Sequence, residues 1–451
     1  MAMTSLTFYG GVGEIGGNKV LLEDRDARIW LDMGSTFDFG SEYFVEYLTP
    51  RERFGLRDYF ALGLLPRLPG LYAADWLESA GLPHEAPRFS AAFISHIHFD
   101  HTNHLRFLDA AIPVHLGIGT KIILDSWEIT TRGMDLLAHD YRTFRTGGGI
   151  DVDGVEVEPI HVDHSAPAAY GFLVHTAAGT VAYTGDLRQH GPHAEMTRDF
   201  IEAARTNEPI ALITEGTRVT PEDPRSNLTE AQVKSKSVEA AGRAKGKAVF
   251  ATFYPRDVDR MRTFVEVAKA VGRKFVVQAR AAHLLVSLSQ DARIQVPDVL
   301  RDQDLLVYDR RFERQDTWEK NLFAQLGDRV VTSDYVRDHQ DELVVQLDFT
   351  TMPELIDIRP VPGSTFIHSK SEPIEEDNEV EEAVANWVRF FKLRRFQYHA
   401  SGHMSEREIA DMIRAIGPKT VIPIHTEYPE RFTSFAPRVI QPTVARPMTL
   451  D

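Results

Sequence analysis

The stretch FISHIHFDH, residues 93–101, determines how the rest of this 451-residue chain is interpreted. The apolar residues that lead into it predict a buried strand, and four side chains that can bind metal follow. Because residues i and i+2 of a strand point the same way, His96 and His98 can hold one metal ion together. If a helix begins near Asp100, then Asp100 and His101 project toward a neighbouring position. Imidazole and carboxylate groups suit zinc, or manganese where oxygen ligands dominate.

Further potential ligands stand at the ends of three other strand-like segments. The segment IHVDHSAP offers His161 or His164, and the pattern alone leaves both open. The segment VAYTGD ends in Asp186, a carboxylate that can bridge two cations. The segment VIPIH ends in His425. A histidine chosen from the 18 in the chain is usually a surface or core residue, but ligands at four strand ends support one another as a metal site.

The stretch GVGEIG, residues 11–16, matches the G-x-G-x-x-G pattern of dinucleotide-binding proteins. That fingerprint needs a helix directly after the glycines, because the helix N-terminus holds the pyrophosphate. Residues 18–32 instead predict a strand, a charged turn and a second strand. The sequence therefore favours a tight turn beside the site, with Glu14 and Asn18 as its hydrogen-bonding braces, over a nucleotide pocket.

The composition of the chain narrows the classes of function that it can have. The chain has 50 basic and 66 acidic residues, and the net charge of −16 argues against binding nucleic acid by bulk electrostatics. It does not exclude a nuclease with a local cationic groove or with metal ions that supply the positive charge. The absence of cysteine excludes disulfides and thiolate ligands. With no apolar run of roughly 18 residues and no signal-peptide pattern, we expect no membrane association and a cytoplasmic protein.

The order of these motifs resembles that of a known family. H-x-H-x-D-H, then DHSAP at 163–167 and TGD at 184–186, is similar to the motif order of metallo-β-lactamase-fold hydrolases, and LDMG resembles their early D-x-G turn. The segments EGT, HASGH and PIHTE, which contain Glu215, His403 and His425, resemble motifs A, B and C of the β-CASP nucleases. Within that branch the residues around the opening glycines and HSAP are most similar to ribonuclease J.

The resemblance implies an α/β fold, a metallo-β-lactamase αββα sandwich with an inserted α/β β-CASP domain. We expect the first part of the sandwich at residues 1–217, the insert at 218–392 and the C-terminal part at 393–451. Residues 37–88 form an aromatic-rich insertion. They are interpreted either as a substrate lid or partner surface, or as the core of an extra helical hairpin.

The resemblance also implies a site that holds two divalent metal ions, zinc or manganese. The resemblance implies that one ion is bound by His96, His98 and His164. The other is bound by Asp100, His101 and His425, and Asp186 bridges both. His403 is expected to protonate the leaving oxygen, and Glu215 to orient the groups around the metals. The remaining implied residues form a loop that holds a substrate phosphate, namely His399, Ser401 and Gly402.

The implied activity is that of a two-metal phosphodiesterase. It is a ribonuclease J-like enzyme that cleaves single-stranded RNA through metal-activated hydroxide, as a 5′-to-3′ exonuclease and also as an endonuclease. RNA is favoured over DNA as the single-stranded partner. One alternative is a β-CASP nuclease that acts on DNA or on a specialised RNA, and a second is a small-molecule metallohydrolase. Because 26 residues follow His425, a homo-oligomer would not use a C-terminal dimerisation domain.

Overall fold

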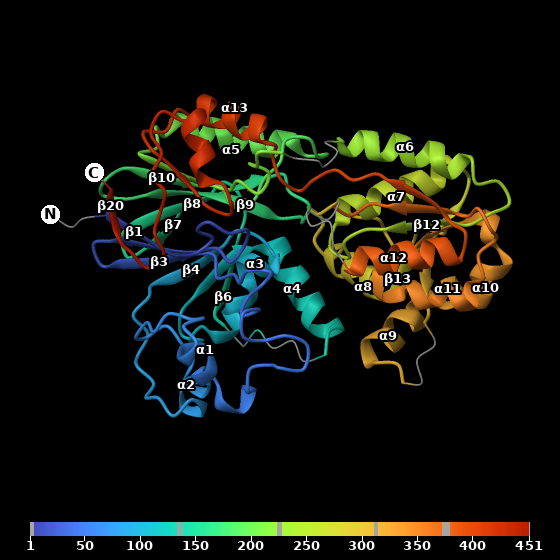
Figure 1. Cartoon of the computed structure of the whole chain (residues 1–451), viewed down its shortest axis with the longest axis horizontal. Coiled ribbons are helices and arrows are strands. Elements are labelled where there is room, and N and C mark those ends of the chain that lie inside the picture. The colour runs from blue at the N-terminus through green and yellow to red at the C-terminus, as the bar shows by residue number, and fades with distance from the viewer. Residues whose placement is uncertain are drawn as a thin grey trace.

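The computed structural model describes residues 4–132, 136, 139–222, 228–310, 314–371 and 379–450. Its strands form three sheets of seven, six and seven strands. Two sheets lie face to face in one half of the molecule, and the third lies in the other half together with helices α6–α12 (Figure 1).

The first sheet mixes antiparallel and parallel pairing. Strands β20, β1, β2 and β3 are antiparallel neighbours, whereas β3, β4, β5 and β6 run parallel. The strand from the C-terminal end therefore lies at one edge, beside the first strand. In spatial order the strands are β20 (Met448–Leu450), β1 (Thr4–Gly10), β2 (Lys19–Asp24), β3 (Ala27–Leu31), β4 (Ala91–Ile94), β5 (Val114–Gly117) and β6 (Tyr141–Phe144).

The second sheet brings together segments from before and after the third sheet. Strands β10, β11 and β19 are parallel, so their carboxyl ends lie at the same edge, while β7, β8, β9 and β10 are antiparallel. In spatial order the strands are β19 (Val421–Pro423), β11 (Ala211–Thr214), β10 (Thr180–Tyr183), β9 (Ala169–His175), β8 (Val155–Val162) and β7 (Ile150–Val152).

These two sheets pack against each other through alternating apolar residues. Phe8 and Phe93 from the first sheet and Phe172 and Tyr183 from the second are fully buried, and the rings of Phe93 and Phe172 meet with centroids 5.7 Å apart. Helices cover both outer faces, so the layers are helix, sheet, sheet, helix, and the predicted αββα sandwich is confirmed. The helices are α1 (Arg57–Ala61), α2 (Ala74–Ser79), α3 (Phe99–Thr102) and α4 (Ile118–Thr130) beside the first sheet, and α5 (Ala194–Thr206) and α13 (Glu406–Ile416) beside the second.

The third sheet is entirely parallel, and its strands carry continuous apolar runs such as FVV and LLV, as expected of strands covered on both faces. In spatial order they are β15 (Val330–Val331), β14 (Leu305–Tyr308), β13 (Lys274–Gln278), β16 (Leu343–Gln346), β12 (Val249–Thr252), β17 (Thr365–His368) and β18 (Arg394–Gln397). One face packs on α6 (Glu230–Gly242), α7 (Val258–Ala270), α8 (Ala279–Leu288) and α9 (Thr317–Leu326), and the other on α10 (Ser333–Asp338), α11 (Leu355–Ile358) and α12 (Glu379–Phe390). The predicted inserted α/β domain is present.

The C-terminal boundary of the inserted domain lies later in the chain than expected. The insert was expected to end at residue 392, but β18 pairs with β17 and belongs to the third sheet, so the insert extends at least to Gln397. The boundary was misjudged because the sequence RRFQ, flanked by charge, does not resemble a buried strand, and β18 is in fact a partly exposed edge strand.

Residues 37–88 divide into two parts. Leu56, Tyr59, Phe60 and Tyr72, in and around α1 and α2, are buried in the core beside the first sheet, which agrees with the helical-hairpin interpretation. Residues 37–48 instead expose large side chains, with Tyr47 92% exposed. Residues 37–48 are therefore largely surface, and the core of this insertion begins at Leu56.

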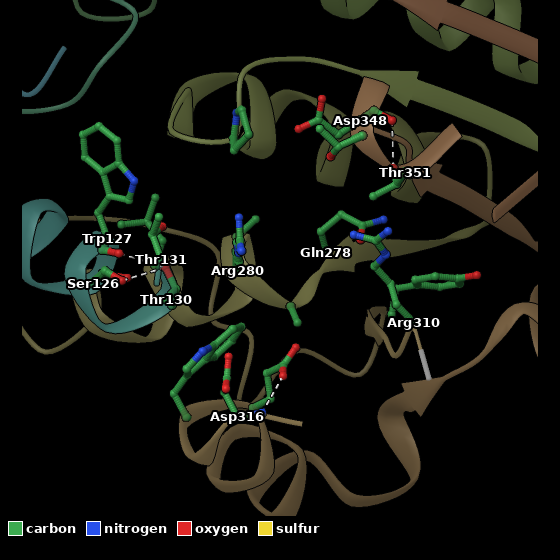
Figure 2. Close-up of a pocket in the computed structure, with 18 of the residues that line it drawn as sticks. Ser126, Trp127, Thr130, Thr131, Gln278, Arg280, Arg310, Asp316, Asp348 and Thr351 are labelled. Atoms are coloured by element: carbon green, nitrogen blue, oxygen red, sulfur yellow. Dashed lines mark hydrogen bonds between the residues drawn. The ribbon is translucent and has the colours of Figure 1, made fainter. Parts of the chain in front are cut away.

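A cavity of about 940 Å³ lies between α4 and the third sheet (Figure 2). Six short 3-10 turns complete the description, namely η1 (Glu52–Phe54), η2 (Asn103–Phe107), η3 (Gly327–Arg329), η4 (Gln340–Glu342), η5 (Phe349–Glu354) and η6 (Pro429–Ser434). Among the described helices, none is long and apolar enough to cross a membrane.

Candidate metal centre

The potential ligands meet at one edge of the sandwich. His96 and His98 follow β4, and α3 then carries Asp100 and His101. The second sheet contributes residues at or beyond strand ends, namely His164 after β8, Asp186 after β10 and His425 after β19. Carboxyl ends of parallel strands share an edge, so segments far apart in the sequence deliver side chains to one place.

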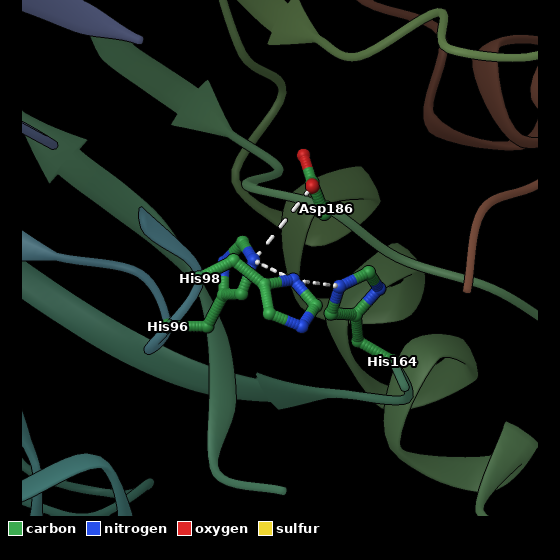
Figure 3. A group of neighbouring side chains, drawn as sticks. All are labelled: His96, His98, His164 and Asp186. Carbon is green, nitrogen blue, oxygen red and sulfur yellow. Dashed lines mark hydrogen bonds and ion pairs between the residues drawn. The ribbon is translucent and has the colours of Figure 1, made fainter. Parts of the chain in front are cut away.

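The first cluster consists of His96, His98, His164 and Asp186 (Figure 3). The Nε2 of His96 lies 3.0 Å from the Nδ1 of His98, and the Nε2 of His164 lies 3.1 Å from the same Nδ1. The Oδ2 of Asp186 is 3.7 Å from the Nε2 of His96. Four donor atoms of buried or half-buried side chains thus face one small space.

The second cluster consists of Asp100, His101, His425 and again Asp186. The Nε2 of His425 lies 3.0 Å from the Oδ2 of Asp100, and the Nε2 of His101 lies 3.2 Å from the Oδ2 of Asp186. The other oxygen of Asp186 is buried and has no hydrogen-bond partner among the described residues. A buried carboxylate oxygen without a partner is costly unless it binds something, so this donor set fits metal ions.

The two clusters differ in charge. Burial lowers the pKa of His98 to about 4, and burial together with neighbouring histidines lowers the pKa of His96 and His164 well below the ordinary value. In the second cluster burial opposes the charged ring, but Asp186 and Asp100 raise the pKa of His425 to about 9. The first cluster therefore offers neutral imidazoles at neutral pH, whereas the second holds protons that a metal ion would displace.

Asp32 supports the second cluster through His101. Its Oδ2 lies 2.7 Å from the Nδ1 of His101 and accepts a hydrogen bond of 2.5 Å from the hydroxyl of Tyr183. Both the backbone N–H and the hydroxyl of Ser95 also donate to its carboxylate, at 2.7 and 2.8 Å. Asp32 was not among the predicted site residues, although the D-x-G turn that contains it was noticed. A carboxylate that orients a ligand histidine is a common feature of metal sites.

His403 lies at the rim of the centre. Its Nδ1 is 2.9 Å from the Oε2 of Glu215 and 3.9 Å from the Oδ2 of Asp186. Glu215 is buried and also accepts a hydrogen bond of 2.7 Å from the hydroxyl of Thr217, which in turn lies 2.8 Å from the Nδ1 of His425. Glu215 therefore connects the rim histidine with a histidine of the second cluster.

The loop of residues 399–402 is fixed from several sides. The carbonyl of Gly402 lies 2.6 Å from the Nδ1 of His164, and the hydroxyl of Ser401 accepts a hydrogen bond of 3.1 Å from the backbone N–H of His403. Burial and the neighbouring Arg260 lower the pKa of His399 well below its ordinary value. His399 is consequently neutral at physiological pH and can serve only as a neutral hydrogen-bonding group.

The opening glycines lie against the second cluster. The backbone N–H of His425 donates to the carbonyl of Gly11 at 2.7 Å, and a Cβ at Gly16 would lie 2.9 Å from the Cβ of Asp100. Glu14 braces the turn by accepting from the N–H of Gly11 at 3.0 Å, and the backbone of Asn18 donates to the carbonyl of Asp100 at 3.1 Å. Strand β2 follows, so the helix that a dinucleotide site requires is replaced by a strand.

His161, the alternative to His164, lies apart from both clusters. It is on β8, and its ring stacks on Tyr170 with centroids 4.1 Å apart. Of the other predicted residues, Asp186, Glu215 and His403 form a third group of neighbouring side chains.

Comparisons with known proteins agree with this arrangement. A model of the beta-lactamase superfamily domain matches residues 69–253, and a model of the Zn-dependent metallo-hydrolase RNA specificity domain matches residues 391–436. The first range contains His96, His98, Asp100, His101, His164, Asp186 and Glu215, and the second contains His399, His403 and His425.

Several curated proteins are similar along most of the chain. It is 23% identical to ribonuclease J of Helicobacter pylori (strain J99 / ATCC 700824), covering 95% of this chain and 56% of that protein. It is 25% identical to ribonuclease J of Sinorhizobium meliloti (80% and 62%) and 23% identical to ribonuclease J2 of Bacillus subtilis (93% and 68%). The chain thus spans little more than half the length of the Helicobacter pylori relative. The crystal structure of a protein of unknown function from Enterococcus faecalis V583 superimposes over all of both chains, with a TM-score of 0.80 and 23% identity.

Proposed function

Because the chain is ribonuclease J-like, with a beta-lactamase superfamily domain and the RNA specificity domain of Zn-dependent metallo-hydrolases, we propose that it is a phosphodiesterase that cleaves single-stranded RNA. The observation that carries the proposal is the pair of His/Asp clusters that share Asp186, with His403 at their rim. Two cation sites joined by a carboxylate are the arrangement used to hydrolyse phosphate esters.

The donor sets suit two divalent cations. His96, His98 and His164 would hold one, Asp100, His101 and His425 the other, and Asp186 would contact both. Zinc is the first choice for such nitrogen-rich sets and manganese the second. Bound there, the cations would lower the pKa of water and stabilise charge on the phosphoryl oxygens.

His403 is the proposed proton donor to the leaving oxygen. Its Nδ1 faces Glu215, so that carboxylate fixes the orientation of the ring, while the Nε2 is left to carry the transferred proton. Its side chain is 21% exposed, so the ring reaches the open side of the centre. Because Glu215 already holds the ring in place, no other group has to move before His403 donates the proton.

The loop of residues 399–402 is the proposed holder of the substrate phosphate next to the scissile one. Ser401 is half-buried beside His403, so its hydroxyl is available to a ligand. The neutral His399 and the N–H groups of the loop would supply the other hydrogen bonds. This placement supports cleavage near a 5′ end, hence 5′-to-3′ exonuclease action, with internal cleavage as a second mode.

The test uses RNA and DNA oligonucleotides of one sequence, each labelled and carrying either a 5′-monophosphate or a 5′-hydroxyl. They are incubated with the full chain in Mn²⁺, Mg²⁺ or Zn²⁺, and bound metal is measured by mass spectrometry. We expect metal-dependent shortening of the RNA, with release of mononucleotides. If only DNA is cleaved, the substrate is DNA and not RNA. If metal-loaded protein cleaves neither, the proposal that the chain is a phosphodiesterase is refuted.

Two variants separate the proposed roles. Asp186→Ala is expected to lose both metal and activity, whereas His403→Ala is expected to keep its metal and lose activity by about 10²–10⁴-fold. A His403→Ala variant that cleaves RNA at the unaltered rate would show that another group supplies the proton.

A further inference from the structure

Lys19, the first residue of β2, is a buried lysine that the proposed chemistry does not use. It is only 8% exposed, and its ammonium group donates at 2.8 Å to the carbonyl of Gly17 and at 2.7 Å to the carbonyl of Gly34. It forms no ion pair with any described carboxylate, and Glu14 acts on it only from a longer distance. A buried ammonium ion without a counterion is costly, so its hydrogen bonds to the two carbonyls are what keep it there.

The two carbonyls belong to separate segments of the chain. Gly17 lies in the glycine-rich segment of residues 11–18, which precedes β2, and Gly34 lies in the turn of residues 32–36, which follows β3. The segments also meet directly, because the backbone N–H of Gly34 donates to the carbonyl of Asn18 at 3.0 Å. The ammonium group of Lys19 is thus a side-chain bridge between them.

Both segments hold the backbone of α3. The N–H of Asn18 donates to the carbonyl of Asp100 at 3.1 Å, and the N–H of Met33 donates to the carbonyl of His101 at 2.9 Å. A Cβ at Gly34 would lie 1.6 Å from the carbonyl oxygen of Asp100, so the turn and the helix are in direct contact. The helix that supplies two side chains of the second cluster therefore rests on the two segments that Lys19 joins.

The charge of Lys19 strengthens this bridge. Burial lowers the pKa of Lys19 to about 8, so the ammonium group still carries its charge at pH 7. Hydrogen bonds from a charged donor are shorter and stronger than those from a neutral one. An apolar side chain of the same length would fill the space and leave the carbonyls of Gly17 and Gly34 without this donor.

We propose that Lys19 is a positioning residue for the second metal ion. Through the carbonyls of Gly17 and Gly34, its ammonium group holds α3, and with it Asp100 and His101, in the geometry that binds the ion. The inference rests on the proposed metal centre, but it concerns the loading of metal and not the cleavage of RNA. The histidines of the first cluster lie outside α3, so binding of the first ion should not depend on Lys19.

The first test measures zinc binding at pH 7 by mass spectrometry and by competition with a chromophoric chelator. Lys19→Met removes the ammonium group and keeps the length of the side chain. We expect it to bind one zinc ion normally and the second about tenfold more weakly or worse. Adding Lys19→Met to His96→Ala, which impairs the first site, should remove the remaining zinc. The control is Lys274→Met at the start of β13 in the insert, which should bind both ions normally.

A second test separates the ammonium group from packing. The chain contains no cysteine, so Lys19→Cys supplies a single thiol. In denaturant its thiolate displaces bromide from 2-bromoethylamine, which gives a side chain of lysine length that ends in an ammonium group. The same reaction with 1-bromopropane gives an equally long side chain that ends in a methyl group. After refolding, the first product should regain the second zinc ion, and the second product should not.

Hydrogen exchange tests the role of Lys19 in the metal-free chain. The N–H groups of Asn18 and Met33 should exchange at least tenfold faster in Lys19→Met. The N–H of Thr365, which donates to the carbonyl of Ala248 in the insert, should exchange at an unchanged rate. Circular dichroism checks folding, and if Lys19→Met does not fold, Lys19→Gln is measured in its place with the same expectation.

The outcomes that overturn the inference are distinct from failure of the proposed function. The inference is wrong if Lys19→Met binds both zinc ions as tightly as the unaltered chain does, or if the propyl product regains the second ion as well as the aminoethyl product does. If the unaltered chain binds no zinc, the proposed metal centre is wrong. The exchange rates of Asn18 and Met33 then decide by themselves whether Lys19 holds α3.

Discussion

The Oδ2 atom of Asp186 lies within 4 Å of ring nitrogens from four histidines. The distances are 3.2 Å to His101, 3.7 Å to His96 and His425, and 3.9 Å to His403. Although burial opposes ionisation, the rings of His101, His425 and His403 hold the pKa of Asp186 well below its ordinary value. One ionised carboxylate therefore joins both clusters and the proposed proton donor.

Asp32 should control metal affinity without touching the metal. Asp32→Asn keeps the shape of the side chain but removes the charge that faces the Nδ1 of His101. Loss of such an orienting carboxylate typically weakens metal binding 10–100-fold, so we expect that decrease in zinc affinity. Competition with a chromophoric chelator measures it, and circular dichroism checks folding. Unchanged zinc affinity in a folded variant would contradict the role assigned to Asp32.

Metal uptake should release protons. Because the pKa of His425 in the metal-free cluster is raised to about 9 and that of His101 also lies well above its ordinary value, both rings are protonated at pH 7. A metal ion needs the neutral ring, so affinity should rise as pH increases toward 9. Calorimetry in buffers of different ionisation enthalpy gives the number of protons released. A titration at pH 7 that releases none would mean that the second cluster does not take the metal.

Residue types and spacing predicted most of the side chains that cluster at the centre, but not the residues that support them. His96, His98 and Asp100 could be identified because strand and helix geometry alone places them near one another. Asp32 contacts His101 across 69 positions of sequence, through a turn with φ of +62° at Asp32 itself. That contact arises from the pairing of β3 with β4, which the sequence does not reveal locally.

At the scale of elements, the opening loop, residues 11–16, passes close to Asp100 at Gly16, where there is no room for a side chain. Gly16 has φ of +82°, and a Cβ there would lie 3.2 Å from the Oδ2 of Asp100 and 2.9 Å from its Cβ. Gly13, in the same loop, has φ of +69° and nothing within 4 Å of an added Cβ. The two glycines thus share the backbone requirement and differ only in what lies beside them.

This difference gives a matched pair of variants. Gly13→Ala and Gly16→Ala should both lose about 1 kcal/mol or more through a positive φ. Only Gly16→Ala should displace Asp100, and we expect its metal content and cleavage rate to fall at least tenfold. Thermal unfolding and metal analysis on both variants make the comparison. Equal metal content in the two would show that the loop does not position Asp100.

The sequence predicted the presence of the α/β insert better than its limits. Apolar runs such as FVV, which lies in β13, are typical of buried parallel strands. The edge strand β18 has the sequence RRFQ and could be assigned only through its pairing with β17. Edge strands carry charge because one side faces solvent, which removes the pattern that prediction relies on.

At the scale of the whole molecule, buried ion pairs join the insert to the sandwich. Arg188, which follows Asp186 closely, is fully buried and lies 3.0 Å from Asp163 and 3.2 Å from Asp259 of α7. Asp257, the N-cap residue of α7, is buried beside them, and its Oδ1 accepts from the N–H of Arg260 at 2.9 Å. Buried ion pairs are therefore part of the contact between the domains.

Asp257 should make stability depend on pH. Burial raises the pKa of Asp257 to about 7, above the value of roughly 3.9 in an unfolded chain, so the folded chain binds the extra proton between these values. This contribution to the free energy of unfolding is complete below about pH 4 and is lost as pH rises through 7. The change is of the order of 4 kcal/mol.

The measurement is denaturant unfolding at several values between pH 5 and 8. Asp257→Asn retains the N-cap acceptor and removes the titrating group, so the fall in stability across this range should become smaller. The matched control is Asp316→Asn at the N-cap of α9, because the hydrogen bond from Arg132 lowers the pKa of Asp316. That variant should keep the slope of the unaltered chain, and an unchanged slope in Asp257→Asn would refute the assignment.

The distribution of the site along the chain has a consequence for its synthesis. The first cluster is complete once Asp186 has been made, but the second lacks His425, and the rim lacks His403, until the whole inserted domain has been translated. A ribosome-bound chain of any shorter length therefore holds only half of the centre. If the chain cleaves RNA as proposed, the messenger from which it is being read is protected from that chain until the codon for His425 has been translated.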